Sequence, residues 1–405
     1  MAVPNLLRAL RFRDFRLLWS GLMISNLGTW MQFTSLGYAV SQIAGTPHRA
    51  ALYLGFMGAV RAVPVLLLSP IAGVVADSYP RLRVLLATNV TMSLAALAFA
   101  LLASMHRLGL AAILVITAFN AAANAFDSPV RQSWTPLLVE REDLGNAIGL
   151  TSVAFNAPAV IGPALAGLLI VWIGIAGSFY FNALATLAVV VAVVMMHPSP
   201  PSIARAEPMF ASIVAGLHSI WTHPVLRAIV GVFAVSAILV RPYFQMIPAY
   251  IVNTLHGNAQ TLGWAIAAAG IGGFAGALVT AGFTGERRSI QWIFSGVLMT
   301  AGVGALGFIA TVPLTFPIFF LIGMGTQGFL GASNTLIQTL ASDEMRGRAI
   351  SVYTMIAIGF VPAGSLVLGS VAAVVGLHVT FIVAGGTTLA LLTAVYASTP
   401  AMRSE

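Results

Sequence analysis

The stretch Gly73-Val-Val-Ala-Asp77-Ser-Tyr-Pro-Arg81-Leu-Arg83 connects two long apolar runs of the sequence. A glycine stands near the end of the first run, an aspartate follows it after four residues, and two arginines precede the second run. Charges gathered in so short a connection are typical of a loop at the surface of a membrane. The apolar runs on either side are therefore candidates for membrane-spanning helices.

The composition predicts that lipid surrounds most of the chain. Of its 405 residues, 59% are hydrophobic and 7% are charged, and the mean hydropathy is +0.95. A soluble core of this length does not need so much apolar surface. A spanning helix needs about 20 apolar residues. The runs that meet this length are 17–43, 50–75, 82–104, 110–132, 146–173, 176–196, 225–253, 259–282, 289–311, 315–340, 348–375 and 378–397.

Arginine sets the expected orientation, because the sequence contains no lysine. Fifteen of the nineteen arginines fall in loops on one side of the predicted helices, so the positive-inside rule places both termini in the cytoplasm. The net charge of +8 is explained by this topology and needs no nucleic-acid partner. The absence of cysteine excludes disulfides and thiol chemistry.

The chain divides into two halves of six predicted helices. A Pro/Ser-rich segment at 197–208 and a short amphipathic stretch at about 209–220 separate them. We therefore predict an N-terminal half at 1–196, a linker at 197–224 and a C-terminal half at 225–405. Residues 140–150 match residues 342–352 at an offset of 202. This internal repeat predicts pseudo-two-fold symmetry, with the substrate path between the halves.

The opening loop resembles the G-x-x-x-D-x-x-x-R-x-R signature of the major facilitator superfamily. Four further stretches are similar to the enterobactin-exporter-type branch of bacterial efflux proteins. They are Arg11-Phe-Arg-Asp-Phe-Arg-Leu-Leu-Trp19, Gly28-Thr-Trp-Met-Gln32, Arg61-Ala-Val-Pro64 and Asp343-Glu-Met-Arg-Gly-Arg-Ala-Ile-Ser-Val-Tyr353.

The resemblance implies an all-α integral membrane protein of twelve transmembrane helices in the inner membrane of a bacterium. It implies a monomeric secondary exporter of a small organic molecule such as a siderophore, which works by alternating access with proton antiport. It also implies that charged loop residues latch one transport conformation. The residues in these loops are Gly73, Asp77, Arg81, Arg83, Arg346 and Arg348.

Two arginines lie within predicted helices. Arg61 is roughly 15 Å deep at 1.5 Å per residue, and Arg241 is similarly central, with Gln245 one turn beyond it. A central charge must find a cavity or a partner. The two arginines either bind an anionic or electron-rich substrate group or tie helices together through backbone carbonyls.

Polar residues form a stripe on each of two other predicted helices. The first stripe contains Asn120, Asn124, Asp127 and Arg131, and the second contains Gln327, Gly331, Asn334 and Gln338, at the same spacing. Gln32 adds a polar group on the first helix. We expect these residues to line the substrate path, although hydrogen bonds between helices could also explain them.

Asp127 is the candidate for proton coupling, because it is the one carboxylate expected inside the membrane. Burial would favour its protonated form, and Arg131 one turn away would favour the charged form. An Asp–Arg pair at this spacing can equally be a structural clasp.

The sequence contains no signature of a cofactor or a metal site. It has no H-x-x-x-H pair, and a Walker loop is impossible without lysine, so ATP does not drive the protein directly. A catalytic cluster of the kind an enzyme needs is also missing. Gly272-x-x-x-Gly276 is typical of close helix packing. Multidrug efflux of lipophilic compounds and lysophospholipid or lipid flipping remain as alternatives to siderophore-type export.

Overall fold

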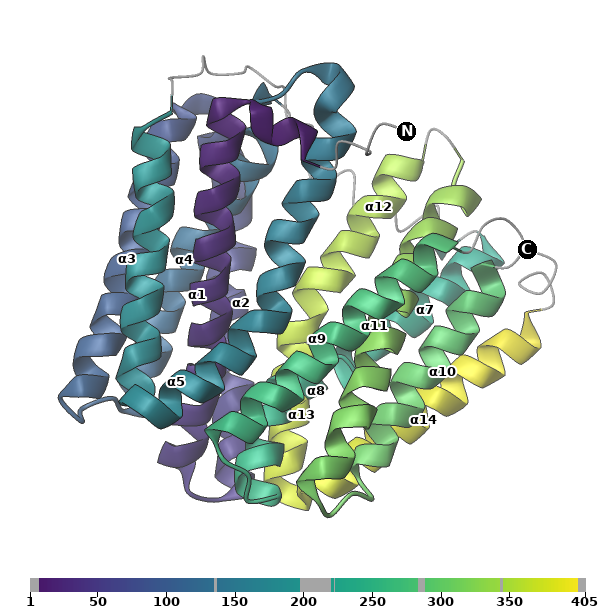
Figure 1. The fold of residues 1–405 in the computed structure, drawn as a ribbon. Helices are drawn as coiled ribbons and strands as arrows, with labels where there is room; N and C mark the ends of the chain where they lie inside the picture. The colour runs from purple at the N-terminus through teal and green to yellow at the C-terminus, as the bar shows by residue number, and fades with distance from the viewer. Residues whose placement is uncertain are drawn as a thin grey trace, which may run out of the picture. The chain divides into compact units, whose positions relative to one another are not determined.

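The computed structural model describes residues 7–134, 137–196, 220–221, 223–282, 288–342 and 345–399. Residues 69, 70, 76, 77, 132, 133 and 281 are described by their backbone alone. The regular structure in these ranges consists of helices (Figure 1). The chain folds into two compact units, residues 1–39 with 60–206 and residues 40–59 with 207–405.

The boundary between the units runs through two continuous helices, α1 (Arg13–Ala44) and α2 (Pro47–Ser78). Residues 40–59 belong to the second unit although they precede the middle of the chain. The division predicted at residues 197–224 stays a prediction, because residues 197–219 lie outside the described ranges. The amphipathic stretch expected at 209–220 falls almost entirely on the same undescribed residues.

The first unit is built on the packing of α3 (Arg81–Ser104) against α4 (Leu110–Trp134) and α5 (Leu144–Val194). A short helix, η1 (Arg8–Arg11), precedes α1, and η3 (Arg141–Asp143) precedes α5. Apolar residues of α1, α3, α4 and α5 form one core around Trp134. Within α5, Gly174 has φ of 75° and ψ of 176°, a non-helical conformation that glycine tolerates. The helix turns there, between the predicted runs 146–173 and 176–196.

The second unit contains α7 (Pro224–Leu239), α8 (Tyr243–Pro248), the π-helix η4 (Ala249–Thr254), α9 (Ala259–Gly282) and α10 (Arg288–Leu306). It continues with α11 (Val312–Leu340), α12 (Arg346–Met355), the π-helix η6 (Ile356–Phe360), α13 (Val361–Val375) and α14 (Leu377–Ser398). Here α11 packs against α9 and α10, and α10 packs against α14. The helical run is interrupted by a turn at residues 240–242 and by η4, next to Pro242 and Pro248, because proline lacks the backbone donor that a continuous helix needs. The π-helix η6 was not predicted.

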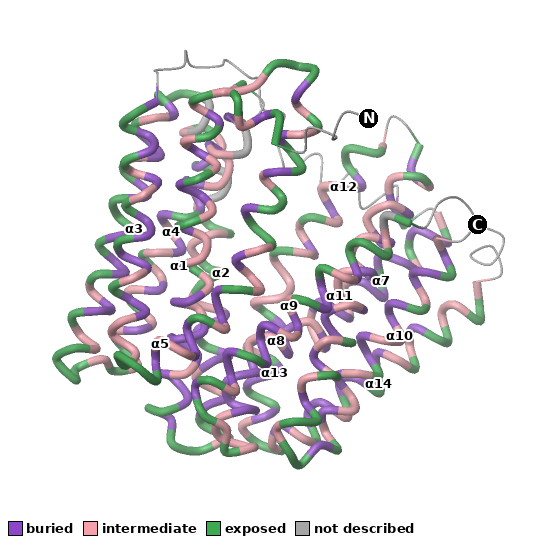
Figure 2. Tube along the Cα trace, in the orientation of Figure 1, coloured by how far each residue is buried: buried purple, intermediate pink, exposed green. Residues whose placement is uncertain are grey.

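The helices suit a lipid environment. Among the described residues, ten helical stretches are long and apolar enough to cross a membrane. Buried and exposed residues alternate along them (Figure 2), and the exposed set includes Leu67, Leu184 and Val374, each at least 69% exposed. Side chains of this kind on the outer surface are compatible with hydrocarbon and would be unfavourable in water.

Glycines allow the closest helix contact of the second unit. A Cβ atom at Gly272 would collide with the carbonyl oxygen of Phe320, and one at Gly276 would collide with that of Met324. On the facing helix, Gly323 approaches the carbonyl of Ala269 in the same way. The close packing predicted for Gly272-x-x-x-Gly276 is therefore confirmed between α9 and α11.

We expect Gly272→Ala to lower the free energy of unfolding by about 2 kcal/mol, because the added methyl meets backbone atoms that cannot rotate away. Thermal unfolding of the purified protein in detergent would measure this loss. Gly231→Ala on α7 is the matched control, since a Cβ there meets nothing within 4 Å. Equal thermal stability of the two variants would contradict the proposed contact.

Candidate functional site

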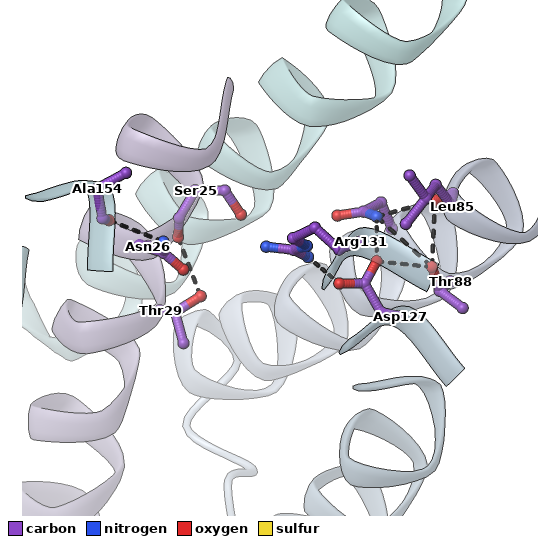
Figure 3. A network of polar contacts seen from close by, with 9 residues as sticks. Ser25, Asn26, Thr29, Leu85, Thr88, Asp127, Arg131 and Ala154 are labelled. Atoms are coloured by element: carbon purple, nitrogen blue, oxygen red, sulfur yellow. Dashed lines mark hydrogen bonds and ion pairs between the residues drawn. The ribbon is translucent and has the colours of Figure 1, made fainter. Parts of the chain in front are cut away.

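A buried polar network joins α3 and α4 in the first unit (Figure 3). The Asp127 side chain is 1% exposed and accepts hydrogen bonds from Thr88 Oγ1 at 2.9 Å and from Asn89 Nδ2 at 2.7 Å. Arg131 lies one helical turn after Asp127 and donates to its other carboxylate oxygen. The structure thus brings together the two residues proposed for proton coupling and adds two partners from α3.

The hydrogen bonds that Asp127 accepts suit its ionised carboxylate form. Three donors hold it, and one of them carries a compensating positive charge. Such an arrangement stabilises the charged form and ties two helices together. The sequence did not reveal Thr88 and Asn89, although a polar pair within an otherwise apolar run could have indicated them.

We expect Asp127→Asn or Arg131→Gln alone to lower the free energy of unfolding by about 3 kcal/mol, because each leaves a buried charge without its partner. The double variant should lose less than the sum of the two, since it leaves neither charge behind. Thermal unfolding of all four proteins completes the cycle. Strictly additive losses would show that the pair does not act as a clasp.

Arg61 lies near the middle of α2, about 21 Å from Pro47 and about 26 Å from Ser78. Its guanidinium sits over the ring of Phe33 from α1, 5.6 Å from the ring centroid. Among the described residues it makes no hydrogen bond and no ion pair, and it is exposed. Its N–H donors therefore remain available at a depth where a bare charge is unfavourable.

Arg241 lies at the interruption between α7 and α8. Its Nη1 donates to the carbonyl oxygen of Ala357, 3.3 Å away in the π-helix η6. Its guanidinium also sits over the ring of Phe233, at 5.7 Å, and Phe233 stacks on Tyr353 with centroids 4.8 Å apart. One face of Arg241 is thus covered by the ring of Phe233, which Tyr353 supports from behind.

Gln245 follows Arg241 by one turn of α8. Its Nε2 atom is buried without a hydrogen-bond partner among the described residues. A buried unsatisfied donor is unfavourable by about 1–3 kcal/mol. Together with the remaining N–H groups of Arg241, it forms a set of donors that an acceptor-rich group would satisfy.

Each predicted stripe contains at least one side chain without a hydrogen-bond partner among the described residues and one pair four residues apart. Asn120 and Gln327 are half-buried and Asn124 is exposed, and none of the three side chains has a hydrogen-bond partner within the described ranges. Asn334 accepts a hydrogen bond from Gln338 Nε2 at 2.7 Å. These four residues stay candidates for the substrate path.

Gln32 occupies a different environment. Its side chain is 6% exposed, and its Oε1 accepts a hydrogen bond from Asn182 Nδ2 at 2.8 Å. This contact links α1 to the second part of α5. A role of Gln32 in substrate binding stays a prediction, and the structure gives it a partner within the protein.

The predicted latch residues lie at helix ends. Arg81 is 4% exposed, and its Nε and Nη1 have no hydrogen-bond partner among the residues described. Gly73 lies in the last two turns of α2, and Arg83 is exposed. The structure describes only the backbone of Asp77. In the second unit, Arg346 Nε donates to the carbonyl of Gln338 at 2.9 Å, and Arg348 Nη1 contacts Met345 Sδ at 3.4 Å.

A further cluster of ion pairs ties the start of the chain to the start of α5. Arg8 Nε lies 2.6 Å from Asp143 Oδ1, and Arg11 Nη2 lies 2.7 Å from Asp143 Oδ2. The Asp143 side chain is 1% exposed. The sequence did not predict these pairs, although the acidic stretch at 140–143 is the signal that could have indicated them.

Small residues also bring residues 47–59 of α2 against α13 within the second unit. A Cβ atom at Gly55 would lie 2.8 Å from the carbonyl oxygen of Ser365, and one at Gly369 would lie 2.5 Å from that of Ala51. His48 Nδ1 lies 2.8 Å from the carbonyl oxygen of Ala373 at the end of this contact. The two helices therefore touch backbone to backbone over several turns.

Comparison with known proteins identifies the family. A family model described as "transmembrane secretion effector" matches residues 6–404. The chain belongs to this family of the major facilitator superfamily. It is accordingly a multi-pass membrane transporter and not an enzyme.

The curated relatives are similar over most of their length. The multidrug efflux pump Tap of Mycolicibacterium fortuitum is 26% identical over 348 residues, which cover 82% of this chain and 84% of the pump. The staphyloferrin A transporter of Staphylococcus aureus is 24% identical over 386 residues, covering 93% and 94%. The enterobactin exporter EntS of Citrobacter koseri is 25% identical over 313 residues, covering 75% and 73%.

Solved structures show the same fold at low sequence identity. An inward-facing bacterial homologue of the iron transporter ferroportin has a TM-score of 0.71 at 18% identity, covering 97% of this chain and 99% of that one. A peptide transporter POT in complex with sulfate has a TM-score of 0.73 at 13% identity, covering 96% and 95%. Both likenesses concern the fold alone.

Proposed function

We propose that the protein is a secondary active exporter of small, anionic or amphipathic organic molecules, such as siderophores. The observation that carries this proposal is the donor set of Arg241 and Gln245, in which Gln245 Nε2 is buried with no acceptor among the described residues and one N–H group of Arg241 donates to the carbonyl of Ala357. Arg61 supports it, because that side chain has an aromatic contact and no hydrogen bond or ion pair among the described residues. The relatives that export enterobactin and transport staphyloferrin A support the same substrate class.

We propose twelve spans in two symmetric halves, with both termini in the cytoplasm. The ten apolar stretches become twelve when α5 is counted twice, across Gly174, and the 32-residue α1 is added. The contacts of α3 with α4 and α5 are repeated by those of α10 with α11 and α14, which supports the symmetry. The distribution of arginine supports the orientation.

Alternating access requires contacts that close and open at each side of the membrane. With this orientation, the contact of residues 47–59 with α13 lies on the outer side and would close that side. The loop residues Gly73, Asp77, Arg81, Arg83, Arg346 and Arg348 would act on the inner side. Exchange against protons, which the family resemblance implies, would use Asp127 with Arg131.

Multidrug efflux is the second candidate. The similarity to the pump Tap favours it, as do the aromatic rings beside both arginines, which suit flat lipophilic compounds. Uptake by inside-out vesicles separates the two candidates. An anionic catecholate siderophore should accumulate if the arginines recognise charge, and a lipophilic cationic dye should accumulate if the protein is a multidrug pump.

We expect Arg241→Ala to weaken transport of the anionic siderophore at least tenfold and that of a neutral analogue much less, because the charge-assisted hydrogen bonds are lost. Initial uptake rates over a range of concentrations would measure both. Arg227→Ala, at an exposed arginine in the first turn of α7, is the matched control. Equal losses for charged and neutral compounds would remove the role of Arg241 in charge recognition.

We expect Gly55→Leu to hold the outer contact open, because the new side chain meets the backbone of Ser365. The protein lacks cysteine, so a single Ser365→Cys substitution reports this contact without background. Labelling by a membrane-impermeant maleimide from outside should rise several-fold in the Gly55→Leu variant, and turnover should fall. Gly386→Leu on α14, where a Cβ meets nothing within 4 Å, should leave the labelling unchanged. An unchanged labelling rate in Gly55→Leu would refute the assignment of the gate.

A further inference from the structure

Gly28 and Gln32 lie one turn apart on α1, and both meet the same residue of α5. That residue is Asn182, which is buried in the part of α5 that follows Gly174. Asn182 Nδ2 donates to Gln32 Oε1 at 2.8 Å. A Cβ atom at Gly28 would lie 2.5 Å from Asn182 Oδ1. The three residues therefore form one buried cluster within the first unit.

The backbone of Gly28 sets which way the Asn182 amide points. A Cα–H group of Gly28 faces Asn182 Oδ1, and this buried oxygen accepts no hydrogen bond from the N–H or O–H groups of the described residues. A Cα–H group is a weak donor, so it suits an oxygen and not an N–H group. Turning the amide over would point the N–H donors of Asn182 at carbon-bound hydrogens, and a buried donor without an acceptor is unfavourable. The nitrogen of Asn182 is thus held toward Gln32.

This orientation determines what Gln32 can offer to another molecule. Because Gln32 Oε1 accepts from Asn182, the Nε2 end of the same amide points away from that contact. Gln32 Nε2 has no hydrogen-bond partner among the described residues, and they do not enclose it. An amide that is free to turn over can present either a donor or an acceptor. Held by Asn182, the amide of Gln32 presents N–H groups alone.

The helix that carries Gln32 is also fixed to the first part of α5. Asn26 Nδ2 donates to the carbonyl oxygen of Ala154 at 2.8 Å (Figure 3). A Cβ atom at Gly162 would lie 2.7 Å from the Cβ atom of Trp30, so α1 and α5 lie close together there. Contacts with both parts of α5 make this section of α1 a rigid support, which a precise binding group needs.

We infer that Gly28 and Asn182 position Gln32 as a hydrogen-bond donor for an acceptor oxygen of the substrate. This inference rests on the function proposed above, to which it adds a subsite within the first unit. Arg61 lies over the ring of Phe33, the residue after Gln32, so a charged donor group lies beside the same part of α1. Such a subsite favours anionic oxygens and disfavours ammonium groups, whose N–H donors would face another donor.

The dissociation constant of a radiolabelled, iron-free catecholate siderophore of net negative charge tests this inference. Equilibrium dialysis against the purified full-length protein in detergent measures it. We expect Gln32→Ala and Asn182→Leu each to raise the dissociation constant roughly fivefold, the loss typical of one hydrogen bond. Because Asn182 acts through Gln32, the double variant should bind no more weakly than Gln32→Ala alone. A purely structural role of Asn182 would instead add its loss to that of Gln32→Ala.

A second variant and a control sharpen the test. The methyl group of Gly28→Ala would displace Asn182 Oδ1, so this variant should also weaken binding, and it should have no further effect in Gln32→Ala. Ser178→Ala, one turn before Asn182 on α5, is the matched control, because it removes a buried hydroxyl that has no partner among the described residues. It should leave the dissociation constant unchanged. The melting temperature of each variant shows that it is folded.

The outcomes distinguish this inference from the proposed function, which Arg241→Ala tests separately. Wild-type affinity in Gln32→Ala or Asn182→Leu, or losses that multiply in the double variant, would overturn the positioned donor and leave the exporter intact. A siderophore that neither binds to the wild-type protein nor accumulates in vesicles would overturn the proposed function and this inference with it.

Discussion

Every charge in the interior of a bilayer must be compensated by a partner within reach, because hydrocarbon offers none. The first unit meets this constraint with Asp127 and Arg131, whose pairing also fixes α4 against α3 through Thr88 and Asn89. Asp143 lies at the start of α5, at a helix end, and its buried carboxylate is likewise paired, with two arginines. Arg61 and Arg241 take part in no ion pair among the described residues, and each guanidinium lies over an aromatic ring instead.

The way the helices pack against one another also depends on the surrounding lipid. Lipid removes the hydrophobic driving force between helices, so close contact depends on van der Waals packing and on hydrogen bonds. Glycine permits this at the contact of α9 with α11 and at that of α2 with α13, where backbones meet directly. The two contacts belong to the same unit and have the same chemistry, but only the second joins segments from opposite ends of the sequence. Small residues thus allow close backbone contact in both places, and in the function proposed above the second contact is the one that separates during transport.

Much of the fold could be predicted because it depends on local properties. Apolar length locates the helices, and proline and glycine indicate the breaks at Pro242 and Gly174. Partners across helices could not be predicted, since they depend on rotation about each helix axis, which a single sequence does not determine. Asn89 as a partner of Asp127, Asn182 as a partner of Gln32, and the association of residues 40–59 with the second unit all fall in this class. The depth of Arg61 and Arg241 could be read from the sequence, whereas their aromatic partners could not.

The choice of arginine matters for how such a transporter can work. A lysine in a dry site can lose its proton, so that the empty site is neutral and the loaded site gains a proton with the substrate. A guanidinium stays charged under all physiological conditions, so the positive charge of Arg61 and Arg241 is present in both loaded and empty forms. Its delocalised charge is more weakly hydrated than an ammonium and lies well against the rings of Phe33 and Phe233, which makes the empty form tolerable. In the function proposed above, a fixed charge supported in this way selects an anion by attraction.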